Sequence, residues 1–210
     1  MKPNRRLLLF LPLAHVFARY MQFFCFAGNV SLGLSSNLKT ILADFKAFKP
    51  TFILAVPRIF EKIYNAASQK AGAGFKGRVF ADATQTACDW SHAQQSGGSI
   101  PLALNAKHAL YNKLVYSSIM EVFGGHVEYA VSGGAPLDSS IAHFFNGVGL
   151  PLLEGYGMTE TCAPSSVNPT EGYKIGTIGL PLQGVTMGVD EEGELCIKSP
   201  AVCAGYHNNP

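Results

Sequence analysis

Short runs of apolar residues, each with the length of a buried strand, recur along the chain before residue 160. Each run is followed by a proline or a glycine, residues that stop a strand from extending. The run at residues 126–131 also alternates apolar and polar positions, which is typical of a strand with one buried face. The expected strands are residues 7–11, 52–56, 126–131 and 150–153.

The segment after the second run carries apolar residues at helical spacing. Residues 58–64 show this spacing first, and the pattern stays mostly helical over residues 61–123, with glycines as breaks. We therefore expect a helical insertion over about residues 61–123.

A further helix is expected after the third run. Asp138 and Ser139 stand near its start, where their side chains can accept hydrogen bonds from free backbone N–H groups. Strand, glycine loop, helix and strand in this order are typical of a parallel sheet with flanking helices, so residues 1–161 are expected to form an α/β part. One face of the helix would carry Leu137, Ile141, Phe144 and Phe145.

The pattern changes after about Cys162, which we take as a soft boundary. Glycines recur there between short alternating runs such as residues 186–189 and 194–197. This spacing predicts β hairpins or a small barrel, so residues 162–210 are expected to be β-rich.

Composition places the chain among globular proteins. With 48% hydrophobic and 14% charged residues, its 210 residues can bury one substantial core. The formal net charge is +2 and no run of like charge is long enough to follow a phosphate backbone, which argues against nucleic acid as a partner. The five cysteines lack the spacing of zinc ligands, and we expect reduced thiols in a cytoplasmic protein.

The N-terminus has some features of a secretory signal peptide, because Lys2, Arg5 and Arg6 precede an apolar run. Pro12 interrupts that run, and His15 follows where small residues would mark a cleavage site. The wider segment contains too many polar residues for a membrane span. We therefore favour a buried strand and a helix over an export signal.

Two glycine-rich segments each follow a strand and are expected at the same edge of the sheet. In residues 132–136, glycines would let a flat ligand approach the backbone near a helix N-terminus, although a plain tight turn is the alternative. In residues 154–160, Tyr156 could stack on a base, Thr159 could bind a phosphate oxygen and Glu160 could hold Mg²⁺. The alternative there is a capped turn in which Thr159 and Glu160 open a helix.

The sequence Tyr156-Gly157-Met158-Thr159-Glu160 resembles the signature of the adenylate-forming superfamily, which includes acyl-CoA synthetases, luciferases and the adenylation domains of peptide synthetases. Residues 57–64 and the helical insertion after them are most similar to the long-chain fatty acid branch. Residues 11–19, 56–62, 132–137 and 179–181 also resemble stretches of the superfamily in their order and spacing. Residues 193–200 and 205–206 resemble the later β region of the same large domain.

This resemblance implies a two-step reaction, in which a fatty carboxylate attacks the α-phosphate of ATP and the thiol of coenzyme A then displaces AMP. Tyr156 would stack on the adenine, Thr159 would contact phosphate and Glu160 would bind Mg²⁺. His15 matches a histidine beside the acyl and adenylate pocket, whereas the residue alone indicates a core or strand-end histidine. Arg19 could equally belong to a buried pair. The other implied cofactor-binding residues are Gly133, Gly134, Ala135 and Pro136 in the first segment, and Glu154, Gly155, Gly157 and Met158 in the second.

Several parts of the family pattern do not occur in these 210 residues. They are the phosphate loop that ends in Pro-Lys-Gly, the Thr-Gly-Asp stretch that holds the ribose, and the small domain that carries the adenylation lysine. We therefore expect a central fragment of the large domain, truncated in its β-rich segment and inactive as a ligase on its own. The resemblance implies fatty acid, ATP and coenzyme A as partners, in the cytoplasm or at the inner face of the membrane.

Three other interpretations are open to the sequence. A non-catalytic module that binds adenylate or acyl chains without turnover is the main one. Amino acid adenylation would require an acidic residue for the substrate amine, and the region near Ser132 has apolar and small residues instead. Residues 72–77 fit the dinucleotide pattern G-x-G-x-x-G but follow a predicted helix, so a flexible bend is favoured over a nucleotide loop.

Overall fold

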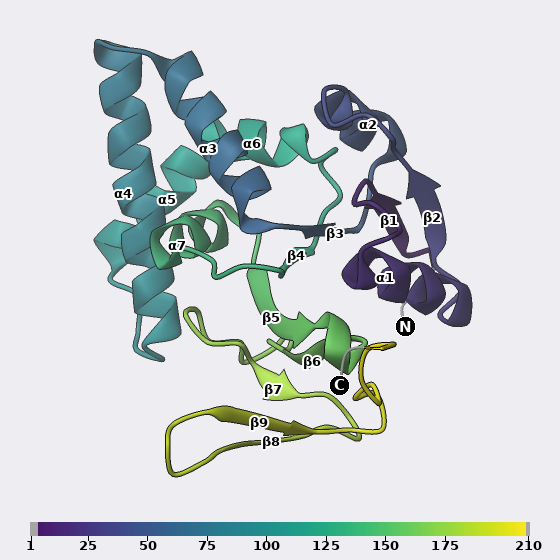
Figure 1. Cartoon of the computed structure of the whole chain (residues 1–210). Coiled ribbons are helices and arrows are strands. Elements are labelled where there is room, and N and C mark those ends of the chain that lie inside the picture. The colour runs from purple at the N-terminus through teal and green to yellow at the C-terminus, as the bar shows by residue number, and fades with distance from the viewer. Residues whose placement is uncertain (1–3, 209–210) are drawn as a thin grey trace.

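The computed structural model describes residues 4–208, which form a seven-stranded sheet flanked by helices and a separate two-stranded sheet (Figure 1). The order in the larger sheet is β2-β1-β3-β4-β5-β6-β7. The strands from β2 to β5 in this order are parallel, whereas β6 and β7 each pair antiparallel with the strand before them. This arrangement confirms the predicted α/β class. The strands are β1 Arg6–Leu9, β2 Ser31–Leu34, β3 Phe52–Ala55, β4 Tyr129–Ser132, β5 Leu152–Met158, β6 Ala163–Val167 and β7 Leu180–Pro181.

Helices cover both faces of this sheet, which explains why its central strands are uninterrupted apolar runs. In β1, Leu7 and Leu9 pack with α1 on one face, while Leu8 packs with the remaining helices on the other. Successive side chains of a strand point to opposite faces, so both faces need apolar residues. The helices are α1 Val16–Ala27, α2 Ile41–Phe48, α3 Pro57–Ala71, α4 Phe75–Gln95, α5 Leu102–Tyr111, the π-helical η1 Asn112–Tyr116, α6 Ser117–Val122, α7 Ser139–Val148 and the 3₁₀ turn η2 Thr159–Thr161.

The chain from α3 to α6 is almost continuously helical and packs on the face opposite α1 (Figure 1). Gly72 ends α3 and Gly74 begins α4, both with positive φ angles of 67° and 81°. The stretch that matches the dinucleotide pattern is therefore a bend between two helices, as its position after a helix predicts.

Two predicted boundaries need correction. β4 begins at Tyr129, not at residue 126, because its partner β3 begins opposite it at Phe52 and the register between the two strands starts with this pair. Helix α7 begins at Ser139, and Asp138 alone accepts hydrogen bonds, from the N–H groups of residues 140 and 141. Leu137, expected on the helix, is buried just before it.

The segment expected as a second glycine loop is mostly a strand. β5 continues through Met158, because it pairs antiparallel with β6 over residues 155–158. The glycines permit this pairing, since a Cβ at Gly157 would lie 2.0 Å from the carbonyl oxygen of Ala163. The prediction of a loop over residues 154–158 was therefore wrong, because glycine was taken as a breaker where it allows two strands to approach closely.

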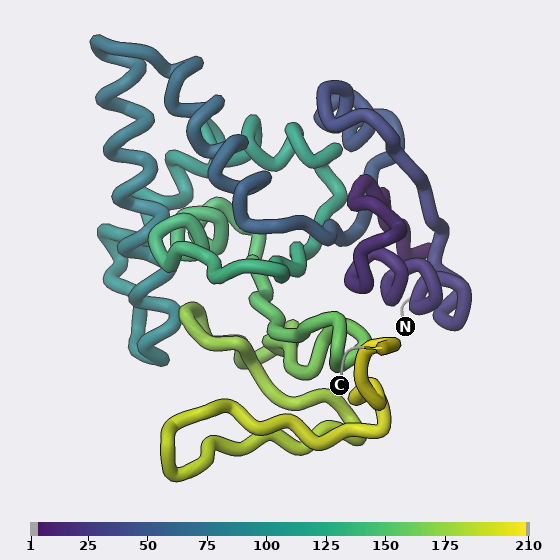
Figure 2. The backbone as a smooth tube through the Cα atoms, in the orientation of Figure 1, coloured from purple at the N-terminus to yellow at the C-terminus, as the bar shows by residue number. Residues whose placement is uncertain are grey.

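The C-terminal part contains a hairpin of β8, Thr186–Val189, and β9, Leu195–Lys198. The backbone then returns to the end of β5, as Figure 2 shows. The expected boundary near residue 162 falls between η2 and β6, inside the order of the larger sheet.

The N-terminal residues form β1 and α1, the strand and helix that we favoured over an export signal. Lys2, on which the signal-peptide interpretation partly depends, lies outside the described residues. Within residues 4–208, the helices are all too short or too polar to cross a membrane. β2 and α2 were not predicted, whereas β6 and β7 lie within residues 162–210, which were expected to be β-rich without individual bounds.

Candidate active site

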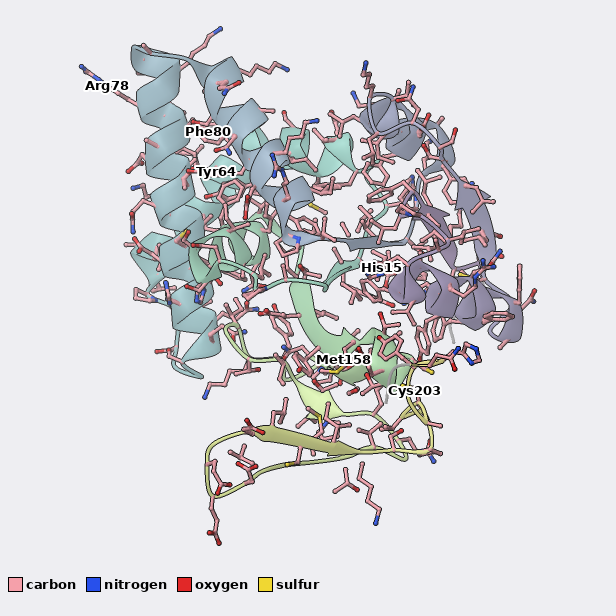
Figure 3. The ribbon with its side chains drawn as sticks, in the orientation of Figure 1. His15, Tyr64, Arg78, Phe80, Met158 and Cys203 are labelled. Carbon is pink, nitrogen blue, oxygen red and sulfur yellow. The ribbon has the colours of Figure 1, made fainter. Side chains whose placement is uncertain are left out.

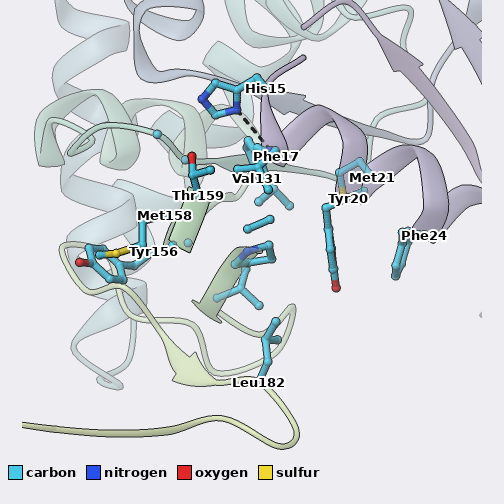
Figure 4. Close-up of a pocket in the computed structure, with 18 of the residues that line it drawn as sticks. His15, Phe17, Tyr20, Met21, Phe24, Val131, Tyr156, Met158, Thr159 and Leu182 are labelled. Atoms are coloured by element: carbon cyan, nitrogen blue, oxygen red, sulfur yellow. Dashed lines mark hydrogen bonds between the residues drawn. The ribbon is translucent and has the colours of Figure 1, made fainter. Parts of the chain in front are cut away.

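A cavity of about 430 Å³ opens beside α1 at the carboxyl ends of β4 and β5 (Figure 4). This is the edge at which open parallel sheets bind ligands. Its walls come from the first turns of α1, from the two glycine-rich segments, residues 132–136 and 154–160, and from the antiparallel strand β6. The lining residues are His15, Val16, Phe17, Tyr20, Met21, Phe24, Phe52, Tyr129, Val131, Gly133, Gly134, Gly155, Tyr156, Gly157, Met158, Thr159, Glu160, Ala163, Pro164, Val167 and Leu182.

Strand pairing brings the two segments together, since Ser132 at the end of β4 lies opposite Glu154 in β5. Gly133 is buried beneath Phe17, whose ring would lie 3.2 Å from a Cβ at this position. Gly134 has a φ of 84°, a conformation that disfavours other residues. The backbone conformation at Gly134 and the tight packing of Phe17 on Gly133 thus favour glycine at both positions, independently of any ligand.

The polar end of the cavity is formed by the last residues of β5 and the turn η2. Tyr156 is half-buried and Thr159 is exposed. Figure 4 shows Tyr156 and Met158 on one side of the cavity and Tyr20 and Phe24 on the other. An aromatic ring, a hydroxyl and the Glu160 carboxylate therefore border the same space as an apolar wall.

Glu160 is tied to a distant part of the chain. Its Oε1 accepts a hydrogen bond of 2.6 Å from the hydroxyl of Tyr206. This bond, followed by an interaction with its own backbone N–H, lowers the pKa of Glu160 and keeps the carboxylate ionised, and the same bond raises the pKa of Tyr206. Thr159 and Glu160 do open a short 3₁₀ turn, η2, which is capped by a hydrogen bond from the N–H of Met158 to the hydroxyl of Thr161, so the capped-turn alternative describes the backbone here and the metal role of Glu160 stays a prediction.

His15 is exposed and lines the cavity from the start of α1. Its Nδ1 accepts a hydrogen bond of 3.2 Å from the N–H of Phe17 and so caps the helix. In the neutral ring the proton then lies on Nε2, which is the atom left to donate to a ligand. Arg19 is exposed and donates to Gln22 within the same helix, so the alternative of a buried pair is wrong.

Three of the predicted ligand contacts lie outside this cavity. Ala135 and Pro136 are exposed and do not line it. Glu154 uses its carboxylate to accept a hydrogen bond of 3.1 Å from the N–H of Leu137, which ties the two segments together. Their roles toward a nucleotide stay predictions.

The sequence reasoning missed the apolar wall and Tyr206. Phe17 falls within the stretch quoted for its resemblance, and Tyr20, Met21 and Phe24 continue it at helical spacing, so a helical wheel could have found them. Tyr206 contacts Glu160 across a separation of 46 residues, a contact for which the sequence holds no signal.

Relatives of similar sequence occur among long-chain acyl-CoA ligases. The chain is 44% identical over its whole length to the long-chain-fatty-acid–CoA ligase FadD15 of Mycobacterium bovis, and 32% identical over 95% of its length to long chain acyl-CoA synthetase 3 of Arabidopsis thaliana. It spans 35% and 32% of those two relatives.

Solved structures show the same fold. The N-terminal domain of FACL13 from Mycobacterium tuberculosis matches with a TM-score of 0.64 at 18% identity, over all of this chain and 44% of that one. The O-succinylbenzoate coenzyme A synthetase of Bacillus subtilis, solved with ATP and a magnesium ion, matches with a TM-score of 0.62 at 18% identity, over 99% of this chain and 35% of that one. Residues 1–207 match the sequence family described as AMP-binding enzyme, and the chain belongs to that family.

Proposed function

We propose that this chain forms the adenylate-binding part of a long-chain fatty acid–CoA ligase, which activates a fatty acid with ATP to acyl-AMP and then transfers the acyl group to coenzyme A. The observation that carries the proposal is the cavity, in which a signature with an aromatic ring, a hydroxyl and a carboxylate faces a wall of apolar side chains. An acyl-adenylate has the same two halves. The long-chain ligases among the relatives support this choice of substrate.

The polar half of the ligand is assigned to the end of β5. Tyr156 would stack on the adenine with its half-buried ring, while Gly133 and Gly134 border the same space. Thr159 would donate its hydroxyl to a phosphate oxygen. His15 would donate from Nε2 to an oxygen at the junction between the acyl and phosphate groups, because its Nδ1 already accepts the N–H of Phe17.

The residues at η2 fit a magnesium ion that is shared with ATP. Among the described residues there is no cluster of three or more His, Cys, Asp or Glu side chains that could hold a metal without a ligand. Mg²⁺ is commonly held by one or two carboxylates together with substrate phosphates, and Glu160 offers one ionised carboxylate at the cavity. When bound, the ion would neutralise charge on the phosphates.

The apolar half of the ligand is assigned to α1, where Tyr20, Met21 and Phe24 line the cavity. On the same helix, Phe23 and Phe26 are 63% and 65% exposed. Exposed aromatic side chains favour a membrane surface, from which a fatty acid could be drawn, so we place the ligase in the cytoplasm or at the inner face of a membrane.

Binding of a stable acyl-adenylate mimic tests the proposal on the 210-residue chain itself. A palmitoyl sulfamoyl-adenosine should bind measurably by calorimetry and more tightly than the acetyl analogue, because only the longer chain buries the apolar wall. Equal binding of the two analogues would reject the acyl assignment. No binding of either, by a chain shown to be folded, would reject the adenylate site.

Tyr156 provides the sharpest single variant in that experiment. Stacking of a base on an aromatic ring is worth roughly 1–3 kcal/mol, so Tyr156→Ala should weaken binding about five- to a hundred-fold. Tyr156→Phe is the matched control and should bind like the wild type, because the ring face does the stacking. If Tyr156→Ala binds as tightly as Tyr156→Phe, the ring does not contact the base.

A further inference from the structure

The chain beyond β9 returns to the candidate active site and meets it at one residue. The N–H of Cys203 donates a hydrogen bond of 2.7 Å to the backbone carbonyl of Glu160, and the hydroxyl of Tyr206 donates one of 2.6 Å to Oε1 of the same residue. Figure 3 shows Cys203 beside Met158 at the end of β5. Residues 203–206 therefore hold both the backbone and the side chain of Glu160.

The location of Glu160 makes such support necessary. It lies in η2, a turn of only three residues, and its side chain borders the cavity. A Glu side chain has three rotatable bonds, and on so short a turn the backbone does little to restrict them. A carboxylate that must meet a cation in a fixed place binds it better when its rotamer is already held, because less conformational freedom is lost on binding.

The hydrogen bond leaves the carboxylate able to bind a cation. An ionised carboxylate has about four lone-pair sites on its two oxygens, and Tyr206 occupies one of those on Oε1. Oε2 is left for a hard cation. Tyr206 itself is 56% exposed and does not line the cavity, so any effect on a ligand must pass through Glu160.

We propose that Tyr206 is a positioning residue, whose hydroxyl fixes the Glu160 carboxylate so that Oε2 is presented to the divalent cation bound with the triphosphate of ATP. The inference rests on the proposed function, because it takes Glu160 as the metal ligand. The inference also gives the segment after β9 a role, since the contacts of residues 203–206 with Glu160 would set the geometry of the metal site.

The test measures cation affinity directly on the 210-residue chain, with Mn²⁺ in place of Mg²⁺ so that free and bound metal can be distinguished by electron paramagnetic resonance. In the presence of saturating ATP, Tyr206→Phe should weaken Mn²⁺ binding about three- to ten-fold, the range expected for the net contribution of one solvent-exposed hydrogen bond. The affinity for ATP without divalent metal should not change, which a general loss of structure could not reproduce.

The matched control is Tyr111→Phe. The hydroxyl of Tyr111 donates to the carboxylate of Asp82 on the surface of α4, so this variant makes the same chemical change away from the cavity. It should leave Mn²⁺ affinity unchanged. In a Glu160→Gln background, Tyr206→Phe should have no further effect on Mn²⁺ binding, since the carboxylate through which Tyr206 acts is already absent.

The outcomes separate this inference from the proposed function. If Glu160→Gln weakens Mn²⁺ binding and Tyr206→Phe does not, the positioning role is wrong and the proposed function stands. If Tyr206→Phe weakens ATP binding equally with and without metal, its role is general packing and the inference is also wrong. If the folded wild-type chain binds neither ATP nor Mn²⁺ with ATP, the proposed function fails and this inference fails with it.

Discussion

At the scale of single residues, a buried polar network links α4 to α7 and to the loop before β7. Nδ1 of His143 is 2.9 Å from the hydroxyl of Ser91, which also accepts a bond of 2.8 Å from Asn146. The amide oxygen of Asn146 accepts from the hydroxyl of Tyr173. Buried polar groups require such partners, but these partners are far apart in the sequence, so no local pattern could have predicted them.

His143 makes the stability of the fold depend on pH. Burial, followed by the charge of the neighbouring His92, lowers its pKa below the ordinary value of 6.5. The unfolded chain therefore binds the proton more readily, and the free energy of unfolding should fall as pH decreases below about 6.5. Urea denaturation between pH 7 and pH 5 should show this slope.

The variant His143→Gln, which cannot be protonated, should flatten the slope. His126→Gln removes an exposed histidine and should preserve it. If both variants have the slope of the wild type, the pH dependence does not come from the buried imidazole.

At the scale of elements, the close packing of α4 against α7 depends on one glycine. A Cβ at Gly147 would lie 2.1 Å from the carbonyl oxygen of Ala87 in α4, so the two helices would have to move apart. Helix propensity alone favours alanine over glycine by about 1 kcal/mol. Steric overlap with the backbone of α4 outweighs this gain.

We therefore expect Gly147→Ala to destabilise the chain by about 1–3 kcal/mol, the usual cost of an overpacked contact, in urea denaturation. Gly98→Ala is the control, because a Cβ there would meet only the Ser96 hydroxyl at 3.6 Å. A Gly147→Ala variant as stable as the wild type would mean that α4 moves away freely.

Glycine's lack of a side chain, which allows close backbone approach, also limited how well the sequence predicted the strands. Apolar runs identified β1 and β3 because strands buried on both faces contain little else. Gly155 and Gly157 were taken as the end of a strand, whereas they allow β5 and β6 to pair closely. Only the partner strand decides between these two uses, and β6 has no regular alternation that would reveal it.

At the scale of the whole molecule, topology assembled a site that the sequence described only in part. The signature at residues 156–160 was recognisable because its residues are consecutive. The facing wall of α1 and the support from Tyr206 come from segments far apart in the sequence, and only the folded chain brings them to the end of β5. The chemistry was therefore easier to predict than the shape of the pocket.

The family motifs that do not occur in these 210 residues predict the behaviour of the chain in isolation. Adenylation moves negative charge onto pyrophosphate, and a phosphate loop, a ribose anchor and a lysine would each stabilise it. None of these motifs occurs in the sequence, although the cavity and Glu160 are present. We therefore expect the chain to bind an acyl-adenylate mimic but to catalyse no exchange of pyrophosphate into ATP with palmitate. Exchange at the rate of a complete ligase would show that the residues around this cavity suffice for chemistry.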